Sequence, residues 1–197
     1  MISIIYDILQ LLHVISFVFM SIPLFNLIVV NERAQMGPGF LFPVDRYMEN
    51  IIAKGAPRCF VFQATVLVTG LLLLVYGSLG IEALWTNGAI SAKFILLLVL
   101  VALLSTVHLI LQPRIEALIA QLDPEQPLPE EIASRLKPLR VRRKKMAAVC
   151  LFLVLTIIIL GLQIYTPFAP GLTLVLIATA ALFAWRAYSS RLSYGWV

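Results

Sequence analysis

The chain has 197 residues, of which 61% are hydrophobic and only 13% are charged. Soluble domains carry about 25% charged residues, so this composition and the long apolar runs indicate a membrane protein with no room for a separate soluble domain. The net charge of +5 does not indicate nucleic-acid binding. The basic residues flank the apolar runs, where membrane topology accounts for them.

Five apolar stretches are each close to the ~20 residues that a helix needs to cross a bilayer. The N-terminal stretch lacks the basic start and the small-residue cleavage site of a signal peptide, so we count it as a span. We predict one all-α transmembrane domain over residues 1–197, with a four-helix bundle as its core and a peripheral C-terminal helix. The predicted spans are residues 5–30, 59–80, 91–112, 146–165 and 169–188.

The first predicted span carries a stripe of polar and soft side chains at helical spacing. The stripe consists of Gln10, His13, Phe17 and Met20, and we expect it to face the bundle interior. Ionisable side chains at membrane depth are costly and are usually functional. A neutral imidazole at position 13 either ligates iron or hydrogen-bonds a neighbouring helix, and the sequence leaves both interpretations open.

Residues 31–58 are predicted to form a cytoplasmic loop. Within it, DRYMENIIAK (residues 45–54) is expected to be a short amphipathic helix that lies flat at the membrane interface. In the second span, Gly70 and Gly77 lie two turns apart on one face. Small residues at that spacing either allow close helix packing or leave room for a flat ring.

The third span contains one ionisable residue near each end, Lys93 and His108. Lys93 either extends to the lipid headgroups or faces a carboxylate inside the bundle. His108 is expected to form a local hydrogen-bonded set with Ser105 and Gln112. At ~1.5 Å per residue, His13 and His108 differ in depth by roughly 16 Å, so one haem is not expected to join them. His13 and Lys93, in contrast, lie in the same half of the membrane.

Residues 113–145 are predicted to form a second cytoplasmic loop, with a helix that starts at Pro129-Glu130-Glu131. The basic run from Arg140 to Lys145 is either a topology anchor or a site for anionic headgroups. Of the 15 Lys and Arg residues, only Lys93 falls on the opposite side of the membrane. The positive-inside rule therefore places the N-terminus outside and the C-terminus inside.

Several other kinds of site leave no signature in the sequence. There is no nucleotide-binding loop, Ser/His/Asp arrangement, HExxH motif or CxxC pair, and beyond Asp7 no span contains a carboxylate. The lack of buried acids weighs against a proton pump or a secondary transporter. Met20 has no methionine or cysteine spaced to hold Cu(I) with it, which weakens a copper-uptake role.

Three segments carry a resemblance to a known family. They are LLHVISFVFMSIPLFNLIVV (residues 11–30), YMENIIAKG (residues 47–55) with Thr69-Gly70-Leu71-Leu72 after it, and AISAKFILLLVLVALL (residues 89–104). Over roughly residues 8–165 the chain resembles the HemJ/CopD-like group of small bacterial membrane proteins. It departs from the HemJ pattern in having no arginine between Leu27 and Val30, and its fifth span is extra.

In that family a first-helix histidine and a third-helix lysine are the functional pair, and members bind haem b or act on porphyrinogens. The resemblance implies that His13 and Lys93 are the catalytic or cofactor-binding residues here, with His13 as the metal ligand. It also implies the cytoplasmic (inner) membrane of a bacterium.

Our leading hypothesis is a membrane protein that binds haem b or a porphyrin in the outer half of the bundle. The predicted binding residues are His13, Met20, Gly70, Gly77 and Lys93. One alternative is a HemJ-like protoporphyrinogen oxidase that uses the same site. Another is a cofactor-free structural subunit of a larger membrane complex. The expected partners are membrane lipid, the tetrapyrrole and either a second copy of the chain or a larger membrane complex.

Overall fold

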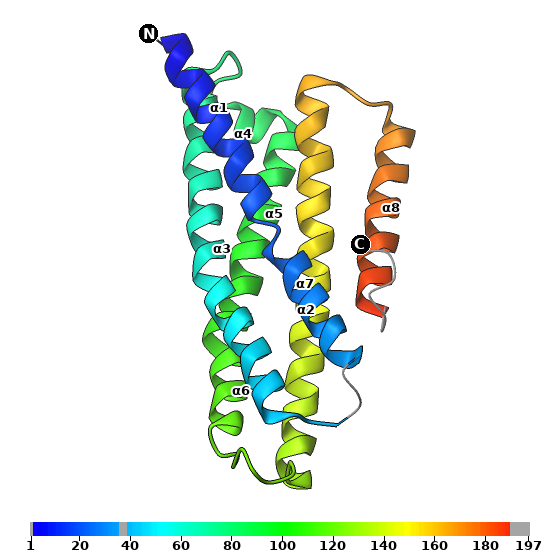
Figure 1. Cartoon of the computed structure of the whole chain (residues 1–197). Helices are drawn as coiled ribbons and strands as arrows, with labels where there is room; N and C mark the ends of the chain where they lie inside the picture. Colours follow the sequence, from blue (N-terminus) through cyan, green and yellow to red (C-terminus); the bar gives the residue numbers. More distant parts are fainter. Residues whose placement is uncertain (1, 36–38, 190–197) are drawn as a thin grey trace.

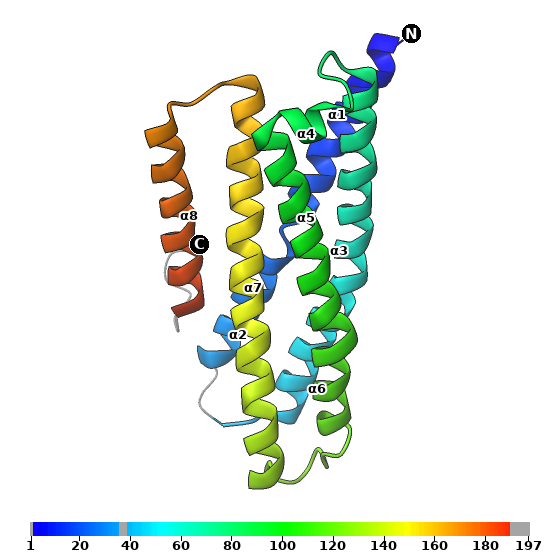
Figure 2. The ribbon, with the colours of Figure 1, turned by 180° about the vertical axis from the view of Figure 1, so that it is seen from behind.

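A computed structural model describes residues 2–35 and 39–189 of the chain (Figure 1). Within these ranges the chain is helical and contains no β-strand. The α5, η1 and α6 segments run on without interruption as one rod (Figure 2). The elements are α1 (Ile2–Phe19), α2 (Ile22–Gln35), α3 (Phe42–Tyr76), α4 (Ala83–Thr86), α5 (Gly88–Thr106), the π-helix η1 (Val107–Leu111), α6 (Gln112–Ile119), α7 (Glu130–Tyr165) and α8 (Pro170–Ser189).

Five helical stretches are long and apolar enough to cross a membrane, which confirms the predicted all-α, multi-pass membrane protein. The first of the five combines α1 and α2, and the third combines α5, η1 and α6. The stretches are Ile4–Arg33, Phe42–Tyr76, Gly88–Ile119, Glu130–Tyr165 and Pro170–Ser189.

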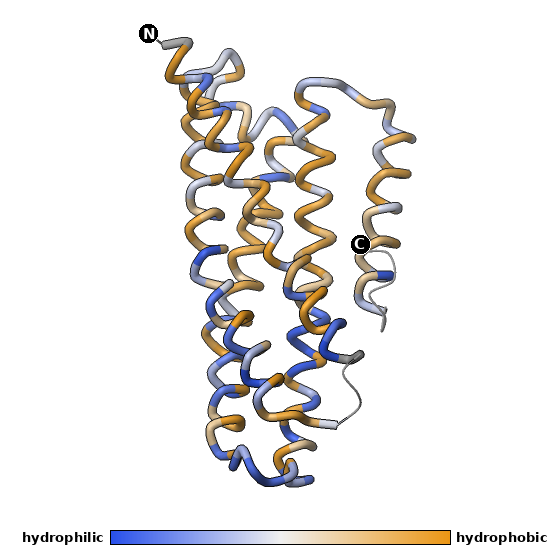
Figure 3. The backbone as a smooth tube through the Cα atoms, in the orientation of Figure 1, coloured by the Kyte–Doolittle hydropathy of each residue, from blue (hydrophilic) through white to orange (hydrophobic). Residues whose placement is uncertain are grey.

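The two ends of the bundle differ in polarity. At the end where α1 begins and α3 and α7 finish, the chain is mostly apolar (Figure 3). At the opposite end, where α3 and α7 begin, hydrophilic residues lie within the helices as well as in the loops (Figure 3). We call the first the cavity end and the second the basic end, for the features described below.

The fifth span, α8, is peripheral, as the sequence predicts. It packs along α7 on the outside of the bundle (Figures 1 and 2). The contact is made by small residues of α8, Ala184 and Ala187, against Leu27, Ala148 and Leu151. Small side chains let two helices approach closely where both are surrounded by lipid.

The first span differs from the single helix that the sequence predicts, because it breaks between α1 and α2 at Met20 and Ser21. Pro23 explains the break. It has no N–H to donate to the carbonyl of Phe19, and its ring would clash with that carbonyl in a continuous helix. The chain turns instead, with the Ser21 hydroxyl donating to the carbonyl oxygen of Val18 over 2.7 Å.

The segments predicted as cytoplasmic loops, residues 31–58 and 113–145, are mostly helical in the structure. The stretch at residues 45–54 does not lie flat at an interface but is a continuous part of α3. The predicted helix start at Glu130 is correct, yet α7 then continues without a break for 36 residues. A helix of that length is about 54 Å long, well beyond a hydrocarbon core of about 30 Å. Long helical extensions therefore carry the basic end past the apolar layer.

Candidate functional site

A cavity of about 420 Å³ lies within the bundle at the cavity end. Its walls come from α1, α3, α5 and α7, together with two residues around α4. Ligand-binding pockets in proteins commonly enclose 300–1,000 Å³ with mostly apolar walls and a few convergent polar groups. The lining residues are Tyr6, Gln10, His13, Val14, Phe17, Val18, Val66, Leu67, Gly70, Leu71, Leu73, Leu74, Leu79, Leu84, Ile90, Lys93, Phe94, Leu97, Ile157, Ile158, Gly161, Leu162, Ile164 and Tyr165.

Three of the five residues predicted to bind a cofactor, His13, Gly70 and Lys93, line this cavity. The other two do not line it. Met20 is fully buried in the core below the cavity, beside Val66 and Leu97. Gly77 lies outside the lining, at the C-cap of α3. An added Cβ there would clash with the carbonyl oxygen of Leu73 and would also come within 3.2 Å of the Tyr6 ring, so the missing side chain serves the end of the helix and its packing against α1.

The imidazole of His13 is held against α3 by the hydroxyl of Thr69, with 3.0 Å between Nδ1 and Oγ1. The Thr69 hydroxyl already donates its proton to the carbonyl oxygen of Thr65 over 2.6 Å. Since a hydroxyl has one proton to give, Oγ1 must accept from Nδ1–H. That fixes the tautomer and leaves Nε2 as the ring nitrogen with a free lone pair.

Gly70 lets this contact form. A Cβ at position 70 would lie 3.1 Å from Cε1 of His13, closer than ordinary packing allows. The absence of a side chain at position 70 therefore brings the imidazole up to the backbone of α3. Thr69 and Gly70 are consecutive, so one short segment of α3 both orients the ring and makes room for it.

Lys93 projects from α5 into the same cavity, next to α7. Its Nζ would lie 3.4 Å from a Cβ built on Gly161. Within the described residues the ammonium has no hydrogen-bond or ion-pair partner, and the cavity lining contains no aspartate or glutamate. The cavity therefore presents the amine of Lys93 and an imidazole lone pair, and no carboxylate among its described lining residues, to whatever occupies it.

The second histidine is elsewhere. The ring of His108 packs edge-on against Phe60 with 5.9 Å between centroids, and its Nδ1 has no partner among the described residues. The predicted hydrogen-bonded set does not form, because Ser105 donates to the carbonyl of Val101 instead. The π-turn η1 shifts the register that the prediction assumed. Pro113 follows this turn and cannot make the α-helical bond to the carbonyl of Leu109.

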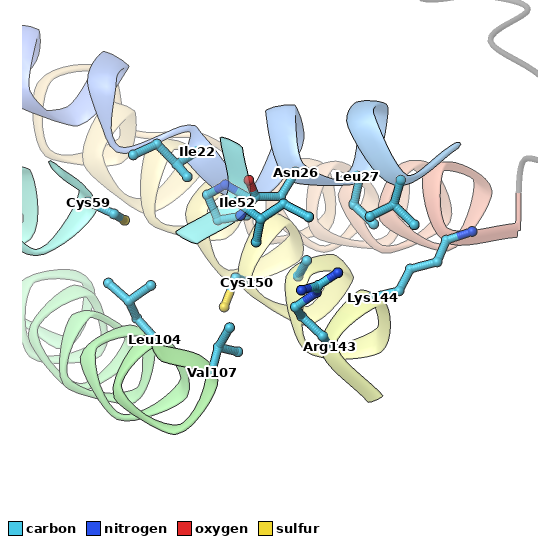
Figure 4. Close-up of a pocket in the computed structure, with 13 residues that line it drawn as sticks. Ile22, Asn26, Leu27, Ile52, Cys59, Leu104, Val107, Arg143, Lys144 and Cys150 are labelled. Carbon is cyan, nitrogen blue, oxygen red and sulfur yellow. The ribbon is translucent and has the colours of Figure 1, made fainter. Parts of the chain in front are cut away.

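A second pocket is much smaller, about 40 Å³. It lies nearer the basic end, between α2, α3, α7 and the continuous α5–η1 helix (Figure 4). Its lining includes the two thiols, Cys59 and Cys150, which are both free and buried, and the guanidinium of Arg143. A space of this size holds water molecules rather than a cofactor.

The basic end holds a buried ionic cluster that the sequence analysis missed. Its two carboxylates, Asp45 and Glu49, are at most 2% exposed. Asp45 pairs with Arg33 at 2.7 Å and with Arg140 at 2.6 Å. Glu49 pairs with Arg140 at 3.0 Å and with Arg143.

Gln112 extends the same cluster to the α5–α6 rod. Its amide donates to Glu49 over 3.2 Å and to Glu116 over 3.1 Å, and its carbonyl oxygen accepts from Arg143 over 2.8 Å. Four segments that are distant in the chain, α2, α3, α6 and α7, are thereby tied together.

The signal for this cluster was present but was assigned to loops. Asp45 and Glu49 are four residues apart, and Arg140 and Arg143 are three apart, which are the spacings that share one helix face. The basic run from Arg140 is therefore not simply a topology anchor or a lipid site. Two of its arginines face the bundle, while Arg142 and Lys145 remain exposed.

Comparison of the chain with protein-family models, curated proteins and solved structures finds no match at the level that would show a relationship. The resemblance to the HemJ/CopD-like group thus stays a prediction.

Proposed function

We propose that this membrane protein binds a tetrapyrrole, haem b or a porphyrin, in the cavity at the cavity end. The observation that carries the proposal is the pairing of two groups in one apolar cavity. Thr69 holds the ring of His13 with Nε2 free, and Lys93 supplies an amine that has no acidic partner among the described residues. An imidazole nitrogen is a common axial ligand of haem iron, and a basic side chain can pair with a buried propionate.

The residues present fit such a guest. His13 would supply the axial ligand through Nε2, and Thr69 would keep the ring oriented, as second-shell groups do at metal sites. Lys93 would pair with a propionate, whose burial without a cation would be strongly disfavoured. The aliphatic and aromatic walls would pack against the faces of the macrocycle. When bound, the iron would supply redox or gas-binding chemistry, and a metal-free porphyrin would not.

The proposal also includes the type of membrane and the orientation of the chain in it. The positive-inside rule favours an N-terminus outside and a C-terminus inside in a bacterial inner membrane. The cavity would then lie in the non-cytoplasmic half. This orientation can be tested by fusing to the C-terminus a reporter protein that is active on only one side of the membrane.

The decisive test is an absorption spectrum. The purified protein, as isolated or after titration with hemin, is expected to show a Soret band that His13→Ala shifts or removes. His108→Ala is the matched control, because that ring faces Phe60 and lies outside the cavity. A colourless protein that leaves the spectrum of added hemin unchanged would contradict the proposal and favour the cofactor-free structural subunit.

A HemJ-like porphyrinogen oxidase is the second candidate, since the free lone pair on Nε2 is also what a proton acceptor requires. Complementation of a strain that lacks protoporphyrinogen oxidation separates the two. Growth that depends on His13 and Lys93 would show catalysis, whereas binding without complementation would show a haem-binding protein.

A further inference from the structure

The cavity opens through the side of the bundle. Six of its lining residues are also among the exposed hydrophobic residues. Four of them flank the gap between two helices: Val14 (54%) and Val18 (63%) on α1, and Ile158 (41%) and Leu162 (50%) on α7. The other two lie at the cavity end of the bundle: Leu79 (47%) before α4, and Tyr165 (64%) at the last residue of α7. A side chain that both lines a cavity and is half exposed stands at its opening. The mouth therefore lies between α1 and α7 and extends to the cavity end of the bundle, at Leu79 and Tyr165.

The packing of the helices accounts for this opening. α1 packs mainly against α3, whereas its continuation, α2, packs against α7. The break at Pro23 lets the two halves of the first span take these different neighbours. At the level of the cavity, α1 is consequently drawn towards α3 and away from α7, and Figure 1 shows the two helices diverging towards the N-terminal end of α1.

Where the mouth lies between α1 and α7, its rim is hydrocarbon on both sides. The four residues that flank this gap are aliphatic and belong to stretches that can cross a membrane, Ile4–Arg33 and Glu130–Tyr165. The phenol of Tyr165 stands at the cavity end of the bundle, at the end of the span. An opening that served water-borne ligands would be rimmed by polar groups. An aliphatic rim within a span faces lipid tails.

We propose that the cavity is entered sideways from the hydrocarbon region of the membrane, through the gap between Val14 and Val18 of α1 and Ile158 and Leu162 of α7. Its ligand would be an amphiphile already dissolved in the bilayer. Lys93 is only five residues, about 7 Å, from the start of α5. The anionic end of the guest would therefore point towards the membrane surface, and its apolar body would lie deeper, at His13. The identity of this amphiphile as a tetrapyrrole rests on the proposed function, but the lipid-facing opening does not.

Photolabelling from the lipid tests the opening without any tetrapyrrole. The full chain is placed in nanodiscs made with a phospholipid that carries a diazirine on its acyl chain, and labelled residues are located by mass spectrometry. Leu97 and Ile157 are at most 6% exposed yet line the cavity, and we expect the carbene to reach them. Leu100 and Leu153, buried in the same core cluster but outside the lining, are the matched control and should stay unlabelled.

Closing the mouth should remove that label. Val14→Trp combined with Leu162→Trp fills the rim from both sides, and labelling of Leu97 and Ile157 is expected to fall to the level of Leu100 and Leu153. The control combines Leu11→Trp with Leu174→Trp, which are exposed but do not line the cavity, and should leave the labelling unchanged. Both pairs place two tryptophans on the lipid face, so a general effect on folding would appear in both.

Adding protoporphyrin before irradiation separates the two proposals. Labelling at Leu97 and Ile157 that protoporphyrin suppresses supports both the opening and the tetrapyrrole. Labelling that protoporphyrin leaves unchanged supports the opening and contradicts the proposed function. Unlabelled Leu97 and Ile157 in the wild-type protein would overturn the lateral entry. In that case, a Soret band from hemin titration would still uphold tetrapyrrole binding.

Discussion

The two ends of the bundle use charge in opposite ways. At the basic end, Asp45 and Glu49 are each matched by arginines from other helices, and Gln112 fills the remaining bonds. At the cavity end, Lys93 has no acid among the described residues and His13 has one ring nitrogen to spare. A buried ionisable group that is fully paired helps to hold the helices together, whereas a buried ionisable group without a partner can interact with a bound ligand. The contrast indicates a stabilising role for the basic end, and it is the basis for the binding role that we propose for the cavity end.

The largest effect on stability is expected from Glu49→Ala. This change leaves Arg143, itself buried, without its carboxylate, and breaking a buried ion pair costs about 3–5 kcal/mol. Thermal unfolding of the purified protein should show a marked drop in Tm. Glu131→Ala, which removes an exposed pair with Arg135, should change Tm little. Equal losses in the two variants would mean that the ionic cluster does not hold the helices together.

Lys93→Met should affect binding and leave stability almost intact. Hydrogen bonds to charged groups contribute about 1.5–3 kcal/mol, so we expect hemin affinity to fall by about 10- to 100-fold. The sharper measurement compares hemin with its dimethyl ester, which carries no carboxylate. The ester should bind the wild type and Lys93→Met equally well, and a loss of affinity for the ester would show that Lys93 does not act through a propionate.

Thr69→Val tests whether the tautomer of His13 matters. Valine keeps the shape of the threonine but cannot accept the Nδ1 proton, and losing such a partner costs metal sites about 10- to 100-fold in affinity. Hemin titration of Thr69→Val measures this directly. Thr65→Val is the control: Thr65 lies one turn away on the same helix, and among the described residues its hydroxyl bonds to the carbonyl of Val61 and not to His13. If both variants bind hemin like the wild type, Thr69 does not position the ligand.

Gly70→Ala is expected to have the smallest effect. The added methyl group would stand 3.1 Å from Cε1 of His13, so the ring must move by a few tenths of an ångström. Overpacking of this kind typically costs about 1–3 kcal/mol, and better helix propensity offsets about 1 kcal/mol of that cost. We expect a small decrease in Tm, well below that of Glu49→Ala, with a weaker and shifted Soret band. Gly88→Ala, where nothing lies within 4 Å of the new methyl group, should change neither quantity.

Much of the architecture follows from local sequence. Hydropathy alone locates the five spans, because each must present ~20 apolar residues to the bilayer whatever its neighbours are. Helical spacing alone puts Gln10, His13 and Phe17 on one stripe, and these three residues do line the cavity together. The nearness of His13 to Lys93 could be expected because both residues lie towards the same end of their spans.

The tertiary structure decided which side chains meet. Met20 would continue the stripe of His13 in a straight helix, but Pro23 breaks the helix and Met20 is buried in the core. Arg143 meets Glu49 across 94 positions of sequence, in a region that polarity alone marks as loop. Periodicity is a property of one helix, whereas pairing depends on how two helices are rotated and kinked against each other. The sequence by itself therefore determined where the membrane layer and the ionisable residues lie. The fold determined that the charges of one end neutralise one another and that those of the other end surround a cavity.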